Sequence, residues 1–355
     1  MSTVDLSPQA VRANRFLPHL VSELSRLTHR RLYRALALLL LIGIAVGSAV
    51  AFAYTHRTTQ IPASAHVQYE RELRNFDRHF PDMVANWQQC ASSVPAGETA
   101  ESFCGPQPDR VRDAPRLEYF YDDRRYEGAS TLPAVVGTVI VAAAILAFVL
   151  GASSGGAEWS SRSMTLQLLW EPRRFRLLSI KWLALALVSL ATALISLVAA
   201  LVLAVLTVAL RGTPDKVDGK YDPGFWSDLG GIAGRGLLLV VVAATFGYAL
   251  SMLVRNTGAA LGVAFIYFAV IENAVRIVSA LLKLYPEPYL LTTNGISFLS
   301  KTGIDVPNGD PSVSTSTGMP LTLHLTHVRS FATLAVYLLA VCIPAIWSFT
   351  RRDVG

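Results

Sequence analysis

The stretch PAVVGTVIVAAAILAFVLGAS, residues 133–153, is apolar throughout and carries no charged side chain. About 20 mostly apolar residues form a helix long enough to cross the hydrocarbon core of a bilayer. Five further runs have this character: 35–54, 177–210, 232–254, 258–284 and 330–350. Because lipid offers no hydrogen-bond partners to the backbone, each span must be a helix. The sequence therefore predicts an all-α polytopic membrane protein with six transmembrane helices.

The composition of the 355-residue chain agrees with this fold class. Hydrophobic residues make up 52% and charged residues only 16%, whereas soluble proteins are about 25% charged. The first run follows a polar segment, is too long for the core of a signal peptide and has no clear cleavage site after it, so we expect it to be retained. The run at 177–210 exceeds the bilayer core, so its helix must tilt or project.

The distribution of basic residues predicts the orientation, since Lys and Arg favour the cytoplasmic side. With both termini inside, the inner segments carry 14 basic and 5 acidic residues, and the outer segments 16 basic and 19 acidic. The formal net charge of +6 is then a topology signal, and we expect no nucleic-acid partner. We predict a multi-pass protein of the cell (plasma) membrane with both termini cytoplasmic.

Residues 55–132 are polar enough to be an extracytoplasmic domain. Cys90 and Cys104 both fall in it, and disulfides form in oxidising compartments. We therefore predict a Cys90–Cys104 disulfide, the alternative being two free thiols. Four aromatic residues near its end form either a small core or a binding face: Tyr119, Phe120, Tyr121 and Tyr126.

The segment before the first span has apolar residues near helical spacing from Phe16 to Leu32, interleaved with Arg26, Arg30, Arg31 and Arg34. This pattern is typical of an amphipathic basic helix on the inner membrane surface. The alternative is an ordinary cytoplasmic helix that packs on the protein.

The loop after the second span contains EWSSRSMTLQLLWEPRR, residues 158–174. Its apolar residues alternate with charged ones, and Pro172 ends any helix before it. We expect a short helix parallel to the membrane. This helix either docks in the groove of a partner protein or only anchors the loop at the membrane interface.

Sequence patterns for catalysis are absent. We find no GxxxxGK[ST], HExxH or GxSxG motif, and the His and Cys residues do not have metal-ligand spacing. We therefore expect no catalytic residue, no metal and no cofactor in this chain. An intramembrane enzyme, whose acids need not form a linear motif, is a weaker alternative.

Glu272 and Arg276 are four residues apart in the fifth span and so share one helix face. Ionisable residues in a membrane usually mark a pathway or a pair. They form either a pathway or gating site at a dimer seam, or a self-satisfied pair near the outer boundary, which Asn273 assists. The following 285–329 is too interrupted by Pro and Gly to span and is expected to be a re-entrant or interfacial segment with a flexible loop.

The order AEW, SM, LLWEPRR and Lys181 resembles the permease subunits of ABC-2 type ABC transporters. The matching residues are Glu158, Ser163, Leu168, Leu169, Pro172, Arg173, Arg174 and Lys181. Arg162 stands where that family usually has Gly. The helix before the first span resembles the elbow helix of the family, and SMLVRNTGAALG (251–262) and SFTRRDV (348–354) resemble its inner turn and its C-terminal ending.

The resemblance implies a permease that works with a second copy or a related permease and with separate ATPase subunits, which hold ATP and Mg²⁺. It implies a coupling helix in 158–174 and an exporter as the function. The coupling residues would be Glu158, Arg162, Ser163, Leu168, Pro172, Arg173 and Arg174. The alternative function is a non-transporting sensor or scaffold whose outer domain binds a ligand or partner.

These expectations divide the chain as follows: 1–34 cytoplasmic with the elbow helix, 35–54 span 1, 55–132 outer domain, 133–153 span 2, 154–178 coupling loop, 179–210 span 3, 211–231 outer loop, 232–254 span 4, 258–284 span 5, 285–329 outer or re-entrant segment, 330–350 span 6, and 351–355 cytoplasmic tail.

Overall fold

The computed structural model describes residues 16–55, 61–95, 99–121, 128–170, 173–211, 223–307 and 322–351. The chain divides into two compact units. The span unit comprises Met1–Ala51, Glu127–Ala209 and Pro214–Gly355, and the loop unit comprises Phe52–Tyr126 with Leu210–Thr213.

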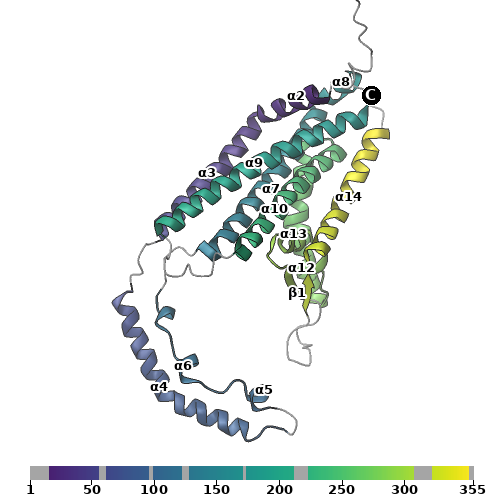
Figure 1. Cartoon of the computed structure of the whole chain (residues 1–355). Helices are drawn as coiled ribbons and strands as arrows, with labels where there is room; N and C mark the ends of the chain where they lie inside the picture. The colour runs from purple at the N-terminus through teal and green to yellow at the C-terminus, as the bar shows by residue number, and fades with distance from the viewer. Residues whose placement is uncertain are drawn as a thin grey trace, which may run out of the picture. The chain divides into compact units, whose positions relative to one another are not determined.

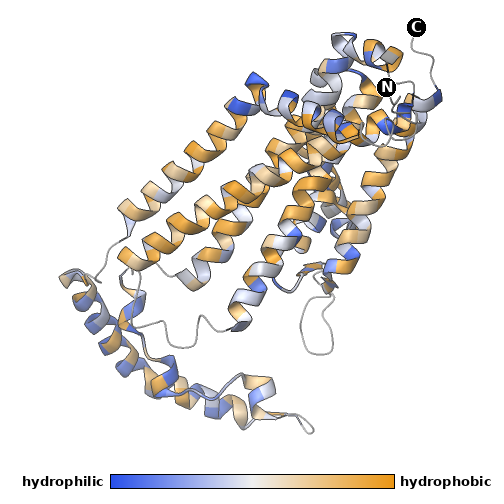
Figure 2. Cartoon of the chain, turned by 45° about the horizontal axis from the view of Figure 1, so that its top comes forward, coloured by the Kyte–Doolittle hydropathy of each residue, from blue (hydrophilic) through white to orange (hydrophobic). Residues whose placement is uncertain are grey.

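Six helices of the described residues are long and apolar enough to cross a membrane (Figures 1 and 2). They are α3 (Arg31–Tyr54), α7 (Gly128–Ser160), α9 (Arg174–Arg211), α10 (Pro223–Val254), the stretch of α11 (Thr257–Phe265), η3 (Ile266–Ile271) and α12 (Glu272–Leu282), and α14 (His327–Arg351). The element η3 is a π-helical turn inside the fifth span. The prediction of an all-α chain with six such helices is confirmed at this level.

Several helices extend beyond the apolar runs that predicted them. Helix α7 begins at Gly128 and ends at Ser160, and α10 begins at Pro223. Backbone hydrogen bonding continues a helix into water, whereas apolar composition marks only the part that lipid surrounds. The polar segments 55–132, 154–178 and 211–231 are therefore shorter than the sequence suggested. Helix α9, at 38 residues, is about 57 Å long and exceeds a ~30 Å hydrocarbon core.

Short elements connect these helices. Helix α2 (Phe16–Thr28) precedes α3, and α8 (Ser163–Trp170) lies between α7 and α9. After α12 come η4 (Glu287–Tyr289), α13 (Leu291–Leu299) and an antiparallel hairpin of β1 (Ile304–Pro307) and β2 (Thr322–Leu325), paired from Ile304 with Leu325 to Pro307 with Thr322. The hairpin was not predicted, and most of the expected flexible loop lies outside the described residues.

The loop unit contains α4 (Ala63–Ala91), α5 (Ala100–Cys104), α6 (Arg110–Asp113) and η1 (Leu117–Tyr119). A disulfide joins Cys90 to Cys104, as predicted. The Trp87 indole donates a hydrogen bond of 3.0 Å to the carbonyl oxygen of Gly105, the residue after Cys104.

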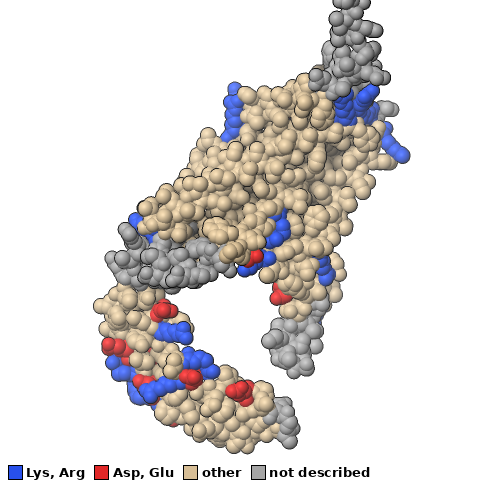
Figure 3. All heavy atoms as spheres, in the orientation of Figure 1, with Lys and Arg blue, Asp and Glu red and all other residues tan. Residues whose placement is uncertain are grey.

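The aromatic cluster of this unit is divided between packing and exposure. The Phe120 ring packs edge-on against Tyr69, whereas Tyr119 is exposed. Tyr126 lies outside the described residues. Figure 3 shows charged side chains of both signs on this unit.

The closest packing in the span unit is between α7 and α10. A Cβ atom added at Gly151 would overlap the carbonyl oxygen of Ala244, and one added at Gly247 would overlap that of Phe148. Small residues let helix backbones approach closely in membrane proteins, where dispersion contacts replace the hydrophobic effect between helices. Gly151 of α7 and Gly247 of α10 therefore set the distance between the two helices.

We predict that Gly151→Ala destabilises the span unit by about 1–3 kcal/mol, because the added methyl group forces the two backbones apart. Gly137→Ala on the same helix is the control, since a Cβ there meets nothing within 4 Å. Thermal unfolding of the purified chain in detergent measures both. Equal midpoints for the two variants would contradict the close α7–α10 contact.

Candidate functional site

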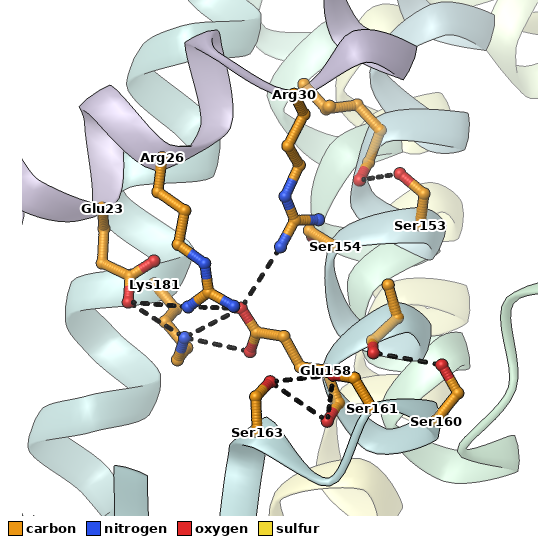
Figure 4. Close-up of polar contacts among 12 residues, drawn as sticks. Glu23, Arg26, Arg30, Ser153, Ser154, Glu158, Ser160, Ser161, Ser163 and Lys181 are labelled. Atoms are coloured by element: carbon orange, nitrogen blue, oxygen red, sulfur yellow. Dashed lines mark hydrogen bonds and ion pairs between the residues drawn. The ribbon is translucent and has the colours of Figure 1, made fainter. Parts of the chain in front are cut away.

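A buried ion pair joins the end of α7 to the start of α9. Glu158 is only 3% exposed and Lys181 only 5%. Lys181 Nζ lies 3.0 Å from Oε1 and 2.9 Å from Oε2 of Glu158 (Figure 4). Charges this deeply buried are stable only when they are paired, because each has lost its hydration. The pair therefore fixes the two helices on either side of α8.

Three side chains from α2 and the turn after it complete this cluster: Glu23 and Arg26 lie in α2, and Arg30 lies between α2 and α3. Glu23 Oε1 lies 3.1 Å from Lys181 Nζ, Arg26 Nη1 lies 3.4 Å from Glu158 Oε1, and Arg30 Nη2 lies 3.5 Å from the same oxygen. Figure 4 shows these groups pointing toward Glu158 and Lys181. We call the five residues, Glu23, Arg26, Arg30, Glu158 and Lys181, the junction cluster.

The junction cluster contains three cations and two carboxylates. Burial lowers the pKa of the Arg30 guanidinium, and the charge of Glu158 opposes that shift. An arginine remains charged under such a shift, so the cluster keeps one excess positive charge. All three cations contact Glu158. Glu158 is therefore the residue on which the cluster depends.

Trp159, the next residue, joins the same point to α10 and α14. Its indole donates to Met252 Sδ at 3.2 Å, and its ring packs edge-on against Phe349. The Arg255 guanidinium lies 4.4 Å from the ring centroid, a cation–π contact. Residues 158 and 159 together connect the end of α7 to four other helices.

Helix α8 begins directly beyond this junction. Ser163 Oγ donates to the Glu158 carbonyl oxygen at 3.4 Å, and Met164 is buried in the same core that Leu168 contacts. Leu166 and Leu169 face the other way and are 61% and 76% exposed. The helix thus has an inner apolar face and a separate outer apolar face.

Arg162 precedes α8 with a φ of 55°. This left-handed conformation is the one that glycine adopts without steric cost. Arg162 adopts this backbone conformation although its side chain is not glycine.

The residues predicted to couple to an ATPase do not form one surface. Glu158 is in the interior, and Ser163 and Leu168 are partly buried. Arg174 Nη1 donates to the carbonyl oxygens of Phe349 at 3.0 Å and Thr350 at 3.2 Å, so it binds the end of α14. Arg162 and Arg173 are exposed. Pro172 lies outside the described residues.

Sequence reasoning placed Arg26 and Arg30 on an amphipathic helix and did not connect them to Glu158. It also did not single out Glu23. One signal was available: Lys181 lies inside the long apolar run and Glu158 beside another. A lone charge at such a place requires a counter-charge, and the charged residues before the first span were the nearest candidates.

Glu272 and Arg276 lie in a second cluster, at the other end of the span unit. Glu272 is almost fully buried and accepts from the backbone N–H groups of Leu291 at 2.9 Å and Thr292 at 3.1 Å, and from the Thr292 hydroxyl. These groups form the first turn of α13. A carboxylate there satisfies unpaired amides and opposes the positive end of the helix dipole.

Arg276 binds the same segment. Its Nε lies 3.1 Å from Glu287 Oε1, and its Nη2 donates to Thr292 Oγ1 at 2.7 Å, whereas its distance to Glu272 is 3.8 Å. Asn273 donates to the carbonyls of its own helix at Phe268 and Ala269. The two charges therefore hold η4 and α13 against α12, and Asn273 does not assist them.

The opposite end of α13 is bound by α10. Arg235 donates 2.9 Å hydrogen bonds to the carbonyl oxygens of Phe298 and Ser300. A cation at the C-terminal end again matches the helix dipole. Charged side chains from two different spans thus hold a nine-residue helix at both ends.

Among the described residues, no group of three or more His, Cys, Asp or Glu side chains is placed to hold a metal ion.

Residues 118–355 match the family described as "Protein of unknown function (DUF2705)". The chain belongs to this family. The match covers more than half of the chain and includes α8 and five of the six long apolar helices, whereas most of the loop unit precedes it. No curated protein matches the chain.

We predict that Glu158→Gln destabilises the chain by at least about 3 kcal/mol, because three cations are left with one carboxylate. Lys181→Met costs less, since Arg26 and Arg30 still oppose Glu158. Arg26→Gln is the control, expected to cost within about 1 kcal/mol because its side chain is partly solvated. Thermal unfolding in detergent ranks the three. An Arg26→Gln effect as large as that of Glu158→Gln would contradict the central role of Glu158.

We predict that Glu272→Gln loosens α13 by about 1–2 kcal/mol, since a neutral amide replaces the charge at its N-terminus. Hydrogen exchange of the amides of residues 291–299 should become faster, and Asn273→Ala should leave it unchanged. Unchanged exchange in Glu272→Gln would contradict the role of Glu272 in holding the N-terminal turn of α13.

Proposed function

We propose that this chain is the membrane-spanning permease subunit of an ATP-driven ABC exporter of the ABC-2 type, with both termini cytoplasmic. The observation that supports it most is the arrangement around α8. Leu166 and Leu169 of α8 are exposed. A buried ion pair between Glu158 and Lys181 joins α7 to α9, the helices on either side of α8. A helix with one exposed face and one face packed firmly on the span unit can transmit a displacement from a partner protein to the spans.

The contacts between α8 and the span unit determine which helices would move when a partner displaces α8. Glu158 lies five residues before Ser163, and Lys181 lies on the next helix. Separating these charges would leave both uncompensated in the interior, which costs several kcal/mol. A displacement of α8 therefore moves α7, α9 and α2 together. Through Trp159 the same movement reaches α10 and α14.

The coupling residues would then have two different roles. Leu166, Leu169, Arg162 and Arg173 are exposed and would contact the ATPase. Glu158, Lys181 and Arg174 would act inside the chain, and Ser163 and Leu168 would fix α8 to it. Pro172 keeps the coupling role that the resemblance implies. ATP and Mg²⁺ would be held by the partner ATPase.

A second permease copy, or a related permease, is the other partner that the resemblance implies. None of the residues of α3 is buried, and most side chains of the stretch from α11 to α12 are exposed. The apolar windows of these two spans are the least buried of the six, at 6% and 11%, so both are left for lipid or for a second copy.

The test is co-purification. We predict that Leu166→Asp with Leu169→Asp removes a co-eluting ATPase from the tagged chain purified in mild detergent from its native cells. Loss of two central apolar contacts should weaken binding by at least ~30-fold. Val328→Asp, an exposed apolar residue of α14 near β2, is the control and should keep the ATPase. An ATPase that stays bound to the double variant would leave α8 as a membrane-interface anchor.

A sensor or scaffold is the second candidate function, and the loop unit is the observation that favours it. That unit is cross-linked by a disulfide, and three of its apolar side chains are exposed: Phe103, Val111 and Tyr119. If the unaltered chain yields a stable complex without any ATPase, this second function becomes the better account.

A further inference from the structure

A groove of about 320 Å³ lies between α9, α10 and α14. It lies in the half of these helices that is nearer to α8. The residues that line it include Phe175 and Trp182 of α9, Thr245 and Tyr248 of α10, and Ile346 of α14. The volume is at the lower end of the ~300–1,000 Å³ typical of small-molecule sites. It is sufficient for part of one long chain and too small for a whole lipid.

The walls of the groove select an apolar occupant. The Trp182 indole already donates to Thr245 Oγ1 at 2.7 Å. Tyr248 is 5% exposed, and its hydroxyl has no hydrogen-bond partner among the described residues. Cys342 contributes a free thiol. A charged or strongly polar ligand would lose its hydration here without replacement, whereas a hydrocarbon chain would lose nothing.

The end of the groove nearer to α8 is basic. Arg174 and Arg176 lie in the first turn of α9, Arg173 precedes it, and Arg351 ends α14. Arg174 reaches from α9 to the carbonyl oxygens at the end of α14, so it closes the groove on that side. Figure 3 shows basic side chains gathered at this end of the molecule. Basic residues at the membrane surface attract anionic headgroups.

We propose that this groove binds an anionic phospholipid, with one acyl chain along α9, α10 and α14 and the phosphate against the arginines at its basic end. Phe175 of the apolar wall stands between Arg174 and Arg176, and Arg351 follows Ile346 by five residues. An apolar wall that continues into a basic end matches the order of groups in a phospholipid. The site does not depend on an ATPase partner.

Tyr248 extends the consequence of binding to the junction cluster. Its ring forms part of the groove wall, and it interacts electrostatically with Glu158 and Arg30. A chain packed against Tyr248 therefore restrains a side chain that lies within the electrostatic influence of the buried charges. Lipid bound in the groove would stabilise the junction of α2, α7 and α9.

Native mass spectrometry of the full chain, stripped of lipid and then given phosphatidylglycerol or phosphatidylcholine, tests the site. We expect phosphatidylglycerol to be retained in preference to phosphatidylcholine. Ser179→Phe, which fills the groove from an exposed position, should abolish retention, whereas Ala191→Phe on an exposed position of the same helix should not. Arg176→Gln with Arg351→Gln should weaken retention by roughly fivefold per arginine, and Arg329→Gln at the other end of α14 should not.

A second readout uses Cys342. The other two cysteines form the disulfide, so a maleimide reports on the groove alone. Phosphatidylglycerol should slow the reaction of Cys342 in the unaltered chain and not in Ser179→Phe. Equal retention by Ser179→Phe and Ala191→Phe would overturn the groove as the site. Equal binding of the two lipids would overturn the role of the arginines.

Discussion

The Glu158–Lys181 ion pair is the interaction on which the rest of the span unit depends. It lies where α7 ends and α9 begins, and three more charges, two from α2 and Arg30 from the turn after it, contact it. A buried pair contributes little net stability compared with apolar packing, but separating its members is costly. It therefore acts as a geometric constraint: α8 can move only together with the helices that hold it.

The second charged cluster follows the same physical rule at the other end of the unit. Glu272 and Arg235 bind the two ends of α13, each with the charge that the helix dipole favours. A nine-residue helix is thereby fixed between spans. Ionisable residues inside the span unit thus hold short helices in place. Helix α8 lies beside a buried ion pair, whereas α13 is held between separate charges at its two ends.

The sequence predicted the parts of this structure that depend on local composition. The length of the apolar runs predicted the six long helices, and the position of Cys90 and Cys104 in one polar segment predicted the disulfide. It could not give the helix ends, because polar residues such as Ser160 continue a helix in water. It could not pair Glu158 with Lys181 and Arg30, since their contact depends on how α2 folds back. It placed Glu272 and Arg276 on one helix face, and they lie 3.8 Å apart. It could not give their shorter contacts in 287–292, because these depend on how η4 and α13 pack on α12.

The distance between α8 and α2 tests the central claim most directly. Spin labels at Leu169→Cys and Val21→Cys, in a chain with Cys342→Ser, report it by pulsed electron paramagnetic resonance in lipid nanodiscs. If the junction cluster makes α2, α8 and α9 one rigid body, the distance distribution is narrow and becomes broad when Glu158→Gln is added. A distribution that stays equally narrow in the Glu158→Gln background would contradict the account.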